Sequence, residues 1–257
     1  MRALVFGANG QVGIELMRAA AAQDLEARPV LRAEADLTDP AAISRLIAES
    51  DADIILNAAA YTAVDKAEEE RDLAFAVNAI APGAMAEAAA AKQIPLLHIS
   101  TDYVFDGSGT RPWRETDPVA PLGAYGASKL AGEQAVAAAG CTSVILRTAW
   151  VFSAHGGNFV KTMLRVGQGR DEMRVVADQF GGPTPARNIA AALWIIARAF
   201  RDGAGVPGTF HFAGAPATSW ADFADAIFAR AGWDAVPAIT RITTADWPTP
   251  TARPANS

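Results

Sequence analysis

The chain has 257 residues, of which 51% are hydrophobic and 19% charged, a composition typical of a compact globular protein with a large core. Its formal net charge is −6 at pH 7 and no basic stripe or patch is evident, which argues against a nucleic-acid partner. The single cysteine, Cys141, excludes an internal disulfide and suits the reducing cytoplasm.

No segment is typical of a targeting signal or a membrane anchor. The first turn glycine, Gly7, comes too early for a secretory signal peptide. The longest apolar run, 189–197, is too short to span a bilayer and is flanked by Arg187 and Arg198. We therefore expect a cytoplasmic protein with no membrane partner.

Strands and helices are predicted to alternate along the first 150 residues. We expect strands at 2–6, 27–31, 53–57, 94–100 and 143–148, and helices at 14–22, 40–49, 75–92 and 126–139. The second helix is expected to have Thr38 or Asp39 as its N-cap and Pro40 as its first residue. This order predicts right-handed βαβ units and an α/β fold with a Rossmann-type, doubly wound parallel sheet.

After Trp150 the alternation weakens. Glycine and proline cluster at 181–185, and we expect helices at 188–200 and 219–231 and a strand at 208–212. Residues 1–150 are therefore predicted to form a nucleotide-binding domain, and 151–257 a smaller C-terminal substrate-binding lobe. That lobe is expected to be discontinuous, because segments near 178–212 return to the first domain.

A glycine-rich turn joins the first strand to the first helix. In GANGQVG, Gly7 permits the tight turn, Gly10 lets the backbone approach a pyrophosphate, and Gly13 lets helix and strand pack closely. The helix N-terminus would supply amide donors to the anion. The spacing alone also occurs in ordinary turns, but its place directly after a strand favours dinucleotide binding.

The end of the second predicted strand bears on the choice of cofactor. NAD sites usually place an acid there to hold the adenosine ribose. This chain has Arg32 instead, and an arginine favours a 2′-phosphate. We therefore expect NADPH, with NADH as the alternative; on the other reading, Arg32 is an ordinary solvated loop residue.

Tyr125 and Lys129 form the candidate reactive pair. They are four residues apart at the start of a predicted helix, and so lie on one face. A neighbouring ammonium lowers the pKa of a phenol from roughly 10, which makes tyrosine a usable proton donor to a carbonyl oxygen. Such a pair is often an ordinary surface pair, but the hydroxyls at Ser100 and Thr101 and the small side chains at 58–60 favour a reactive site.

Motifs along the whole chain carry a family resemblance. They are GANGQVG, NAAAYTAVDKAE, VNA, STDYVFDG, APLGAYGASKLAGE, ILRTAWVF, NFVKTML, DQFGGPT, WPTP and RPANS. Together they resemble the extended short-chain dehydrogenase/reductase superfamily and, more narrowly, its dTDP-4-dehydrorhamnose reductase family. The resemblance implies reduction of dTDP-4-dehydro-L-rhamnose to dTDP-L-rhamnose, with hydride from NAD(P)H to sugar carbon 4.

The resemblance also implies residue roles. Tyr125 would protonate oxygen 4, Lys129 would orient the cofactor ribose and tune Tyr125, and Thr101 would bind the reacting oxygen. The implied cofactor contacts are Gly10, Gln11 and Val12 at the pyrophosphate, Asp36 and Leu37 at the adenine, and Ala60, Tyr61 and Thr62 near the nicotinamide, with Ala58 and Ala59 beside them. The implied substrate contacts are Thr101, Asp102, Trp150 and Arg253.

Other activities are weighed against this one. Dehydratases of the superfamily carry Thr-Asp-Glu where this chain has Thr101, Asp102 and Tyr103, so reduction fits better than loss of water. A reductase or epimerase of another 4-keto sugar nucleotide stays open. A non-catalytic NADP-binding regulatory subunit is the alternative from another class, and the intact Tyr125 and Lys129 argue against it.

Departures from the family concern metal, length and assembly. Some members are thought to dimerise around magnesium held by glutamates, and Glu15 matches one such position. Arg187 replaces another glutamate, and a cation there would repel the metal, so we expect no metal site. Members usually continue past RPANS, which makes this chain a short variant or a truncated one. We expect a monomer or homodimer.

Overall fold

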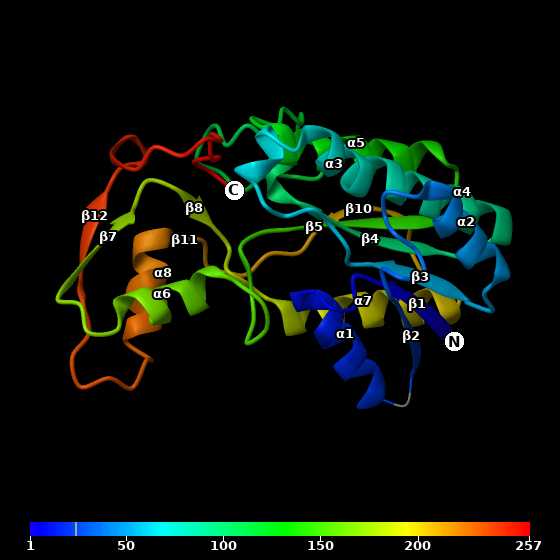
Figure 1. Ribbon diagram of the computed structural model, residues 1–257, viewed down its shortest axis with the longest axis horizontal. Helices are drawn as coiled ribbons and strands as arrows, with labels where there is room; N and C mark the ends of the chain where they lie inside the picture. The colour runs from blue at the N-terminus through cyan, green and yellow to red at the C-terminus, as the bar shows by residue number, and fades with distance from the viewer. Residues whose placement is uncertain (24) are drawn as a thin grey trace.

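A six-stranded parallel sheet organises the computed structural model, which describes residues 1–23 and 25–257 (Figure 1). Its strands are β1 (Arg2–Phe6), β2 (Glu26–Val30), β3 (Ile54–Asn57), β4 (Leu96–Thr101), β5 (Ser143–Thr148) and β10 (Gly208–His211). They lie in the order β10-β5-β4-β3-β1-β2, and every pairing is parallel. The predicted doubly wound fold is confirmed, and its topological switch point lies between β1 and β3.

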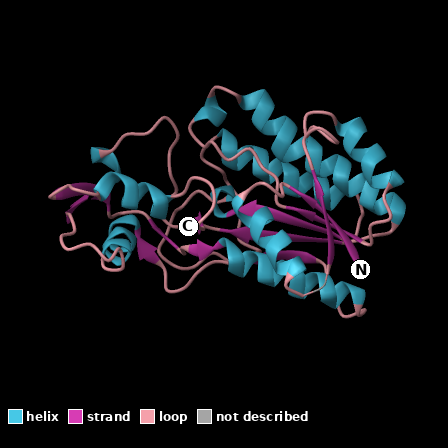
Figure 2. Ribbon diagram, turned by 60° about the horizontal axis from the view of Figure 1, so that its bottom comes forward, coloured by secondary structure: helices cyan, strands magenta, loops and turns pink. Residues whose placement is uncertain are grey.

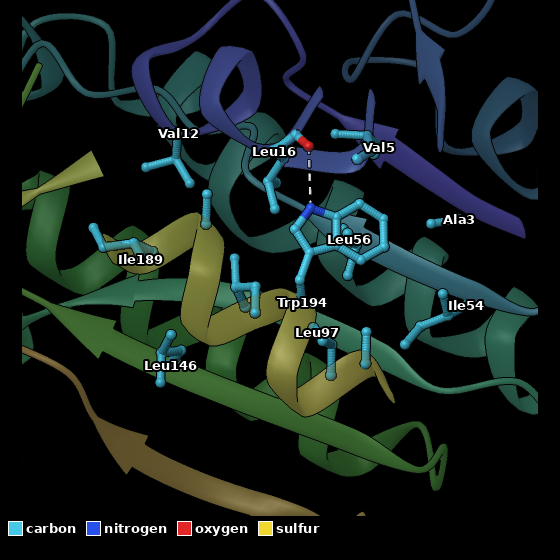
Figure 3. Packing of buried hydrophobic residues seen from close by; sticks show 14 of the residues in the cluster. Ala3, Val5, Val12, Leu16, Ile54, Leu56, Leu97, Leu146, Ile189 and Trp194 are labelled. Carbon is cyan, nitrogen blue, oxygen red and sulfur yellow. Dashed lines mark hydrogen bonds between the residues drawn. The ribbon is translucent and has the colours of Figure 1, made fainter. Parts of the chain in front are cut away.

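Helices cover both faces of this sheet. On one face lie α1 (Gln11–Ala21) and α7 (Ala186–Arg201), and on the other α2 (Pro40–Glu49), α4 (Ala81–Lys92) and α5 (Ala124–Ala138) (Figures 1 and 2). Trp194 of α7 is fully buried between α1 and the sheet, where its indole nitrogen donates a hydrogen bond to the Leu16 carbonyl (Figure 3). Satisfying that one polar atom lets the largest side chain of the core be buried at little cost.

The expected boundaries are correct to within a few residues, with one informative difference. The helix expected from residue 75 begins at Arg71: α3 (Arg71–Phe75) continues through a π-helical turn, η2 (Ala76–Ile80), into α4. The whole segment, Arg71–Lys92, is long and apolar enough to cross a membrane by length and composition. In the fold it packs against α2 and α5, as a core helix does.

A second group of elements lies beyond the carboxyl end of the sheet (Figures 1 and 2). It contains α6 (Phe159–Gly167), α8 (Trp220–Phe228), and the parallel pair β7 (Glu172–Val176) and β12 (Ala238–Ile242). Short pairs join it to the rest: β6 (Val151–Phe152) with β9 (Thr184–Pro185), and β8 (Phe180–Gly181) with β11 (Thr218–Ser219). We call this group the small lobe. The sequence pattern did not predict α6, β7 or β12.

The last residues of the chain return to the large lobe. Phe180 donates its N–H to the Ala255 carbonyl, and Asn256 donates its N–H to the Gly107 carbonyl. The Trp113 indole donates to the Asn256 carbonyl at 3.0 Å. Residues far apart in sequence therefore meet at the junction of the two lobes, beside the end of β4.

Candidate active site

The hydroxyl-bearing end of β4 forms a compact hydrogen-bonded turn. The Thr101 hydroxyl accepts the Tyr103 N–H at 3.2 Å and donates to Asp102 Oδ1 at 2.9 Å. This bonding ends the strand and starts the short 3₁₀ turn η3 (Asp102–Val104). Gly126 of α5 packs directly on this turn, because a Cβ there would lie 2.2 Å from the Tyr103 carbonyl oxygen. The close approach brings Tyr125 beside Thr101.

Tyr125 is held as a neutral phenol. The expectation that the Lys129 ammonium lowers the pKa of this phenol is wrong for the free protein. Burial raises the pKa of the hydroxyl to about 12, and the Thr101 hydroxyl opposes part of that rise. The Tyr103 ring meets the Tyr125 ring edge to face, with centroids 5.5 Å apart. A phenol that keeps its proton and lies beside a second hydroxyl is equipped to donate a proton to a carbonyl oxygen.

Lys129 lies one turn further along α5 and is 2% exposed. Its Nζ donates to the Ile99 carbonyl at 2.7 Å and lies 3.3 Å from His98 Nε2. Burial lowers the pKa of the amine to about 8, and the nearby charge of Glu133 opposes that change. Glu133 is itself paired with Arg147 at 2.6 Å in the same buried layer.

Asp102 is a buried carboxyl at the same strand end. Burial raises its pKa to about 7, and the hydrogen bond from Thr101 opposes part of the rise. Its second oxygen contacts the Ser257 hydroxyl. The group is therefore poised to bind a polar ligand either as an acid or as a carboxylate.

The glycine turn between β1 and α1 has no room for side chains. Gly7 has φ of +77°, and a Cβ there would lie 2.5 Å from the Ala59 backbone nitrogen. A Cβ on Gly13 would lie 2.0 Å from the Gly7 carbonyl oxygen. Gly10 is the N-cap of α1 and has no side-chain cap, so the first amides of the helix are available to an anion.

A groove runs along the carboxyl ends of the strands. Its inner part, a cavity of about 640 Å³, is lined by most of the expected site residues: Gly7, Gly10, Gln11, Val12, Leu37, Ala58, Ala59, Ala60, Thr62, Thr101, Asp102, Tyr125, Lys129 and Trp150. A second cavity of about 420 Å³ shares Gly7, Leu37, Ala59 and Ala60 and adds Arg32, Asp36 and Tyr61. We call the part at Thr101, Tyr125 and Lys129 the inner end, and the part at Arg32 and Asp36 the outer end.

The outer end is exposed to solvent. Arg32 Nε donates to Asp36 Oδ2 at 2.9 Å, although the arginine side chain is 85% exposed. Asp36 also accepts the N–H and hydroxyl of Thr38, at 2.9 and 2.8 Å. Hydrogen bonds from Thr38 and then Arg32 lower the pKa of Asp36 to about 2. A fixed carboxylate thus holds an arginine at the rim of the groove.

Trp150 forms the wall between the groove and the small lobe. Its φ of +47° is rare for a residue with a bulky side chain, and such strain persists only where the surroundings enforce it. The enforcing contacts are a parallel stack on Trp220, with centroids 3.4 Å apart, and Gly181, whose Cβ would lie 2.5 Å from the indole. The strained backbone turns the indole into the groove.

Arg253 lies where the last residues of the chain meet both lobes. It lines a separate cavity of about 240 Å³ with Arg174, Trp220 and Trp247. Its guanidinium is paired with Asp65 at 2.8 Å. Trp220 lines this cavity and stacks on Trp150, which lines the groove.

Glu15, which matches a metal-binding position of the family, is engaged by other side chains. Its Oε1 lies 3.1 Å from His155 Nε2 and 3.4 Å from Arg18 NH1. In residues 1–23 and 25–257, no group of three or more His, Cys, Asp or Glu is arranged to hold a metal ion. The expectation of no metal stays a prediction.

Two polar groups of the site were missed by the sequence reasoning. Asn78, in the π-helical turn, accepts the Tyr61 N–H at 2.8 Å and donates to Ser128 of α5 at 3.0 Å, so it ties the 58–62 loop to the helix of Tyr125. Asn57 and His98, fully or nearly buried, contact each other at 2.9 Å beneath Lys129. The motif VNA was a signal for Asn78.

Comparison with known proteins agrees over the full chain. The family model described as RmlD substrate binding domain matches residues 1–257. A dTDP-4-dehydrorhamnose reductase of Burkholderia thailandensis is 48% identical, over 100% of this chain and 89% of the relative.

Solved structures lead to the same family. The structure of a dTDP-4-dehydrorhamnose reductase from Clostridium acetobutylicum superposes with a TM-score of 0.93 at 40% identity, covering 100% of this chain and 89% of that one. The Bacillus anthracis enzyme, in complex with NADP, also gives 0.93, at 36% identity and coverage of 99% and 88%.

Proposed function

Because the chain belongs to the dTDP-4-dehydrorhamnose reductase family, we propose that it reduces dTDP-4-dehydro-L-rhamnose to dTDP-L-rhamnose with NADPH. It is an oxidoreductase that acts on a small nucleotide sugar. The observation that carries this proposal is the meeting of Thr101, Tyr125 and Lys129 at one end of a groove whose walls include the glycine turn. A protein that only binds the cofactor would need the glycine turn but not these three side chains.

The chain's own residues move the proton. The Tyr125 phenol donates its proton to oxygen 4 of the sugar as that oxygen gains negative charge, and the Thr101 hydroxyl binds the same oxygen. Lys129 orients the cofactor ribose, and in its charged form it stabilises the phenolate that Tyr125 leaves behind. When bound, the reduced nicotinamide supplies the hydride to carbon 4.

The groove fits a dinucleotide cofactor that carries a 2′-phosphate. Gly7 and Gly13 leave no room for a Cβ, so the turn lies close against β3 and α1, and the uncapped amides after Gly10 face the groove. Arg32 at the outer end would hold the 2′-phosphate, which favours NADPH over NADH. Asp36, Leu37 and Tyr61 would border the adenine, and the alanines 58–60 would let the nicotinamide half lie against the backbone.

The substrate would bridge the two lobes. Asp102 and Trp150 would hold the sugar in the groove, while Arg253 and Arg174, which line one cavity where the lobes meet, would supply positive charge for the diphosphate. In this division residues 1–150, with the returning α7 and β10, bind the cofactor, and the rest of 151–257 binds the substrate. The enzyme works in the cytoplasm as a monomer or homodimer, without nucleic-acid, membrane or metal partners.

One assay tests the proposal. Purified protein is mixed with NADPH and dTDP-4-dehydro-L-rhamnose made in situ, absorbance of the reduced cofactor is followed, and the product sugar is identified by NMR. We expect stoichiometric oxidation of NADPH and dTDP-L-rhamnose as product. A different 6-deoxyhexose would assign the chain to a sister reductase, conversion without NADPH consumption would indicate an epimerase, and NADPH binding without turnover would indicate a regulatory subunit.

A further inference from the structure

A buried polar chain lies beneath Lys129 and reaches from β3 through β4 to α5. Asn57 and His98 are partners in the parallel pairing of β3 with β4, so their side chains lie next to each other on one face of the sheet. Asn57 Nδ2 lies 2.9 Å from His98 Nδ1, and His98 Nε2 lies 3.3 Å from Lys129 Nζ. Exposed fractions are 2%, 0% and 2%, so water cannot replace any of these contacts.

The Asn57 amide fixes the tautomer of His98. The Ala59 backbone N–H donates to Asn57 Oδ1 at 3.0 Å, and because a backbone N–H can only donate, the other amide atom, Nδ2, must face the imidazole. Nδ2 is a donor, so His98 Nδ1 must accept. Burial holds the pKa of His98 well below its usual range, so the ring is neutral and its single proton is on Nε2.

That proton points at Lys129. An ammonium has donors only, and an N–H from His98 would face another donor across 3.3 Å. A neutral amine has a lone pair that accepts the Nε2–H, and it still donates to the Ile99 carbonyl at 2.7 Å. The hydrogen-bond geometry therefore favours the neutral amine, in the same direction as burial.

The other charges around Lys129 do not remove this preference. On its own helix, Glu133 favours the ammonium, but that carboxylate is bound by Arg147 of β5 through hydrogen bonds of 2.6 to 3.2 Å. Tyr125 is a neutral phenol, and Asp102 does not contribute to the shift in the pKa of Lys129, whose causes are burial and Glu133. Of these titratable groups, His98 is in direct contact with Lys129 Nζ, at 3.3 Å.

We propose that His98, locked by Asn57 as the Nε2–H tautomer, is a positioning residue that sets the protonation state of Lys129. It holds Nζ against the Ile99 carbonyl as a neutral amine that takes up a proton close to physiological pH. Lys129, which lines the groove, can then take up a proton from water there and stabilise the negative charge that develops on Tyr125. The inference rests on the proposed role of Lys129 in reduction, but it is tested without turnover.

NMR of the full-length, cofactor-free protein can observe this directly. The sequence has only four lysines, Lys66, Lys92, Lys129 and Lys161, so ¹³Cε-lysine labelling gives four signals, and Lys129→Met assigns the one of interest. We expect Lys129 to titrate near pH 8 in the wild type. In His98→Gln, whose side-chain oxygen can accept from an ammonium, the midpoint should rise by ~1 pH unit or more.

A matched control and a second measurement guard against a general structural effect. His211→Gln changes a second histidine of the same sheet, the partly buried one on β10, and should leave the titration midpoint of Lys129 unchanged. With only three histidines, ¹⁵N NMR of the wild type should show His98 neutral and protonated on Nε2. A wild-type midpoint near pH 10.4, an unchanged midpoint in His98→Gln, or the Nδ1–H tautomer would each overturn the proposal.

Discussion

The two ends of the groove hold their polar groups in opposite ways. At the inner end Thr101, Lys129 and Asp102 are buried. Burial raises the pKa of Asp102 and lowers the pKa of Lys129, and so favours the neutral form of both groups. At the outer end Arg32 and Asp36 form an ion pair in water, and hydrogen bonds keep the carboxylate charged. The inner end is built for proton transfer, where small displacements are costly. The outer end is built for selecting a ligand, where screening by solvent makes each contact weak.

The largest effect should come from removing the proton donor of the inner end. Tyr125→Phe keeps the ring and its packing on Tyr103 but loses the hydroxyl, so kcat should fall by roughly 10²–10⁴-fold. NADPH affinity, measured by fluorescence titration, should be nearly unchanged. Full turnover by this variant would falsify the assignment of Tyr125 as the proton donor.

The next effect concerns the glycine turn between the two ends. Gly13→Ala places a Cβ 2.0 Å from the Gly7 carbonyl oxygen, so α1 must move away from the turn. Overpacking of this kind costs about 1–3 kcal/mol, and we expect a loss of that size in NADPH binding measured by calorimetry, with lower thermal stability. Gly157→Ala is the matched control, because its Cβ meets nothing within 4 Å although it borders the same cavity. Equal behaviour of the two variants would contradict this interpretation.

The buried carboxyl of the inner end should make stability depend on pH. Asp102 has a pKa of about 7 in the fold against 3.8 as the reference, so the unfolded chain releases this proton first as pH rises. The contribution of Asp102 to stability therefore declines from about pH 4 to pH 7. Asp102→Asn cannot ionise, and we expect it to be more stable than the wild type by up to about 4 kcal/mol at pH 8 in urea denaturation.

Two comparisons make this pH prediction specific. The advantage of Asp102→Asn should shrink toward zero below about pH 4, where the wild-type carboxyl is protonated in both states. Asp106→Asn, in the same loop, should give no gain at pH 8, because Ser108 hydrogen bonds lower the pKa of that exposed carboxylate. A gain that is constant with pH would indicate that the effect comes from packing.

The smallest effect should come from the outer end. Arg32→Ala removes a guanidinium that is 85% exposed and already paired with Asp36, so the preference for NADPH over NADH should fall by less than about tenfold. The ratio of kcat/KM for the two cofactors at low and high salt measures this. Arg28→Ala, whose partner is Glu34, is a nearby exposed control that should not change the ratio. An unchanged ratio in Arg32→Ala would assign Arg32 to the solvated surface.

Most of the sequence predictions rest on the spacing of residues within one helix, strand or turn. Gly7, Gly10 and Gly13 follow a single strand, and Tyr125 and Lys129 are one helical turn apart, so local geometry was enough to group each set. The alternation of strands and helices likewise predicted the doubly wound sheet. In the small lobe the pattern predicted α8 but not α6, β7 or β12.

What could not be predicted depends on pairing between distant segments. The contact of Asn57 with His98 exists because β3 and β4 pair in one particular register, 41 residues apart, and no local pattern specifies that register. The strained backbone of Trp150 depends on Trp220 and Gly181, which come from other strands and helices. The place of Arg253 likewise depends on distant segments, because it lines a cavity with Arg174 and Trp220 and is paired with Asp65.

The repeated crossing of the chain between lobes restricts how they can move. The backbone passes from one lobe to the other after Trp150, before Ala186, after His211 and after Ile242. A junction that the chain crosses several times resists twisting and sliding of the lobes, which leaves hinge bending as the motion it permits. Bending alone would widen or narrow the groove without sliding one of its walls past the other.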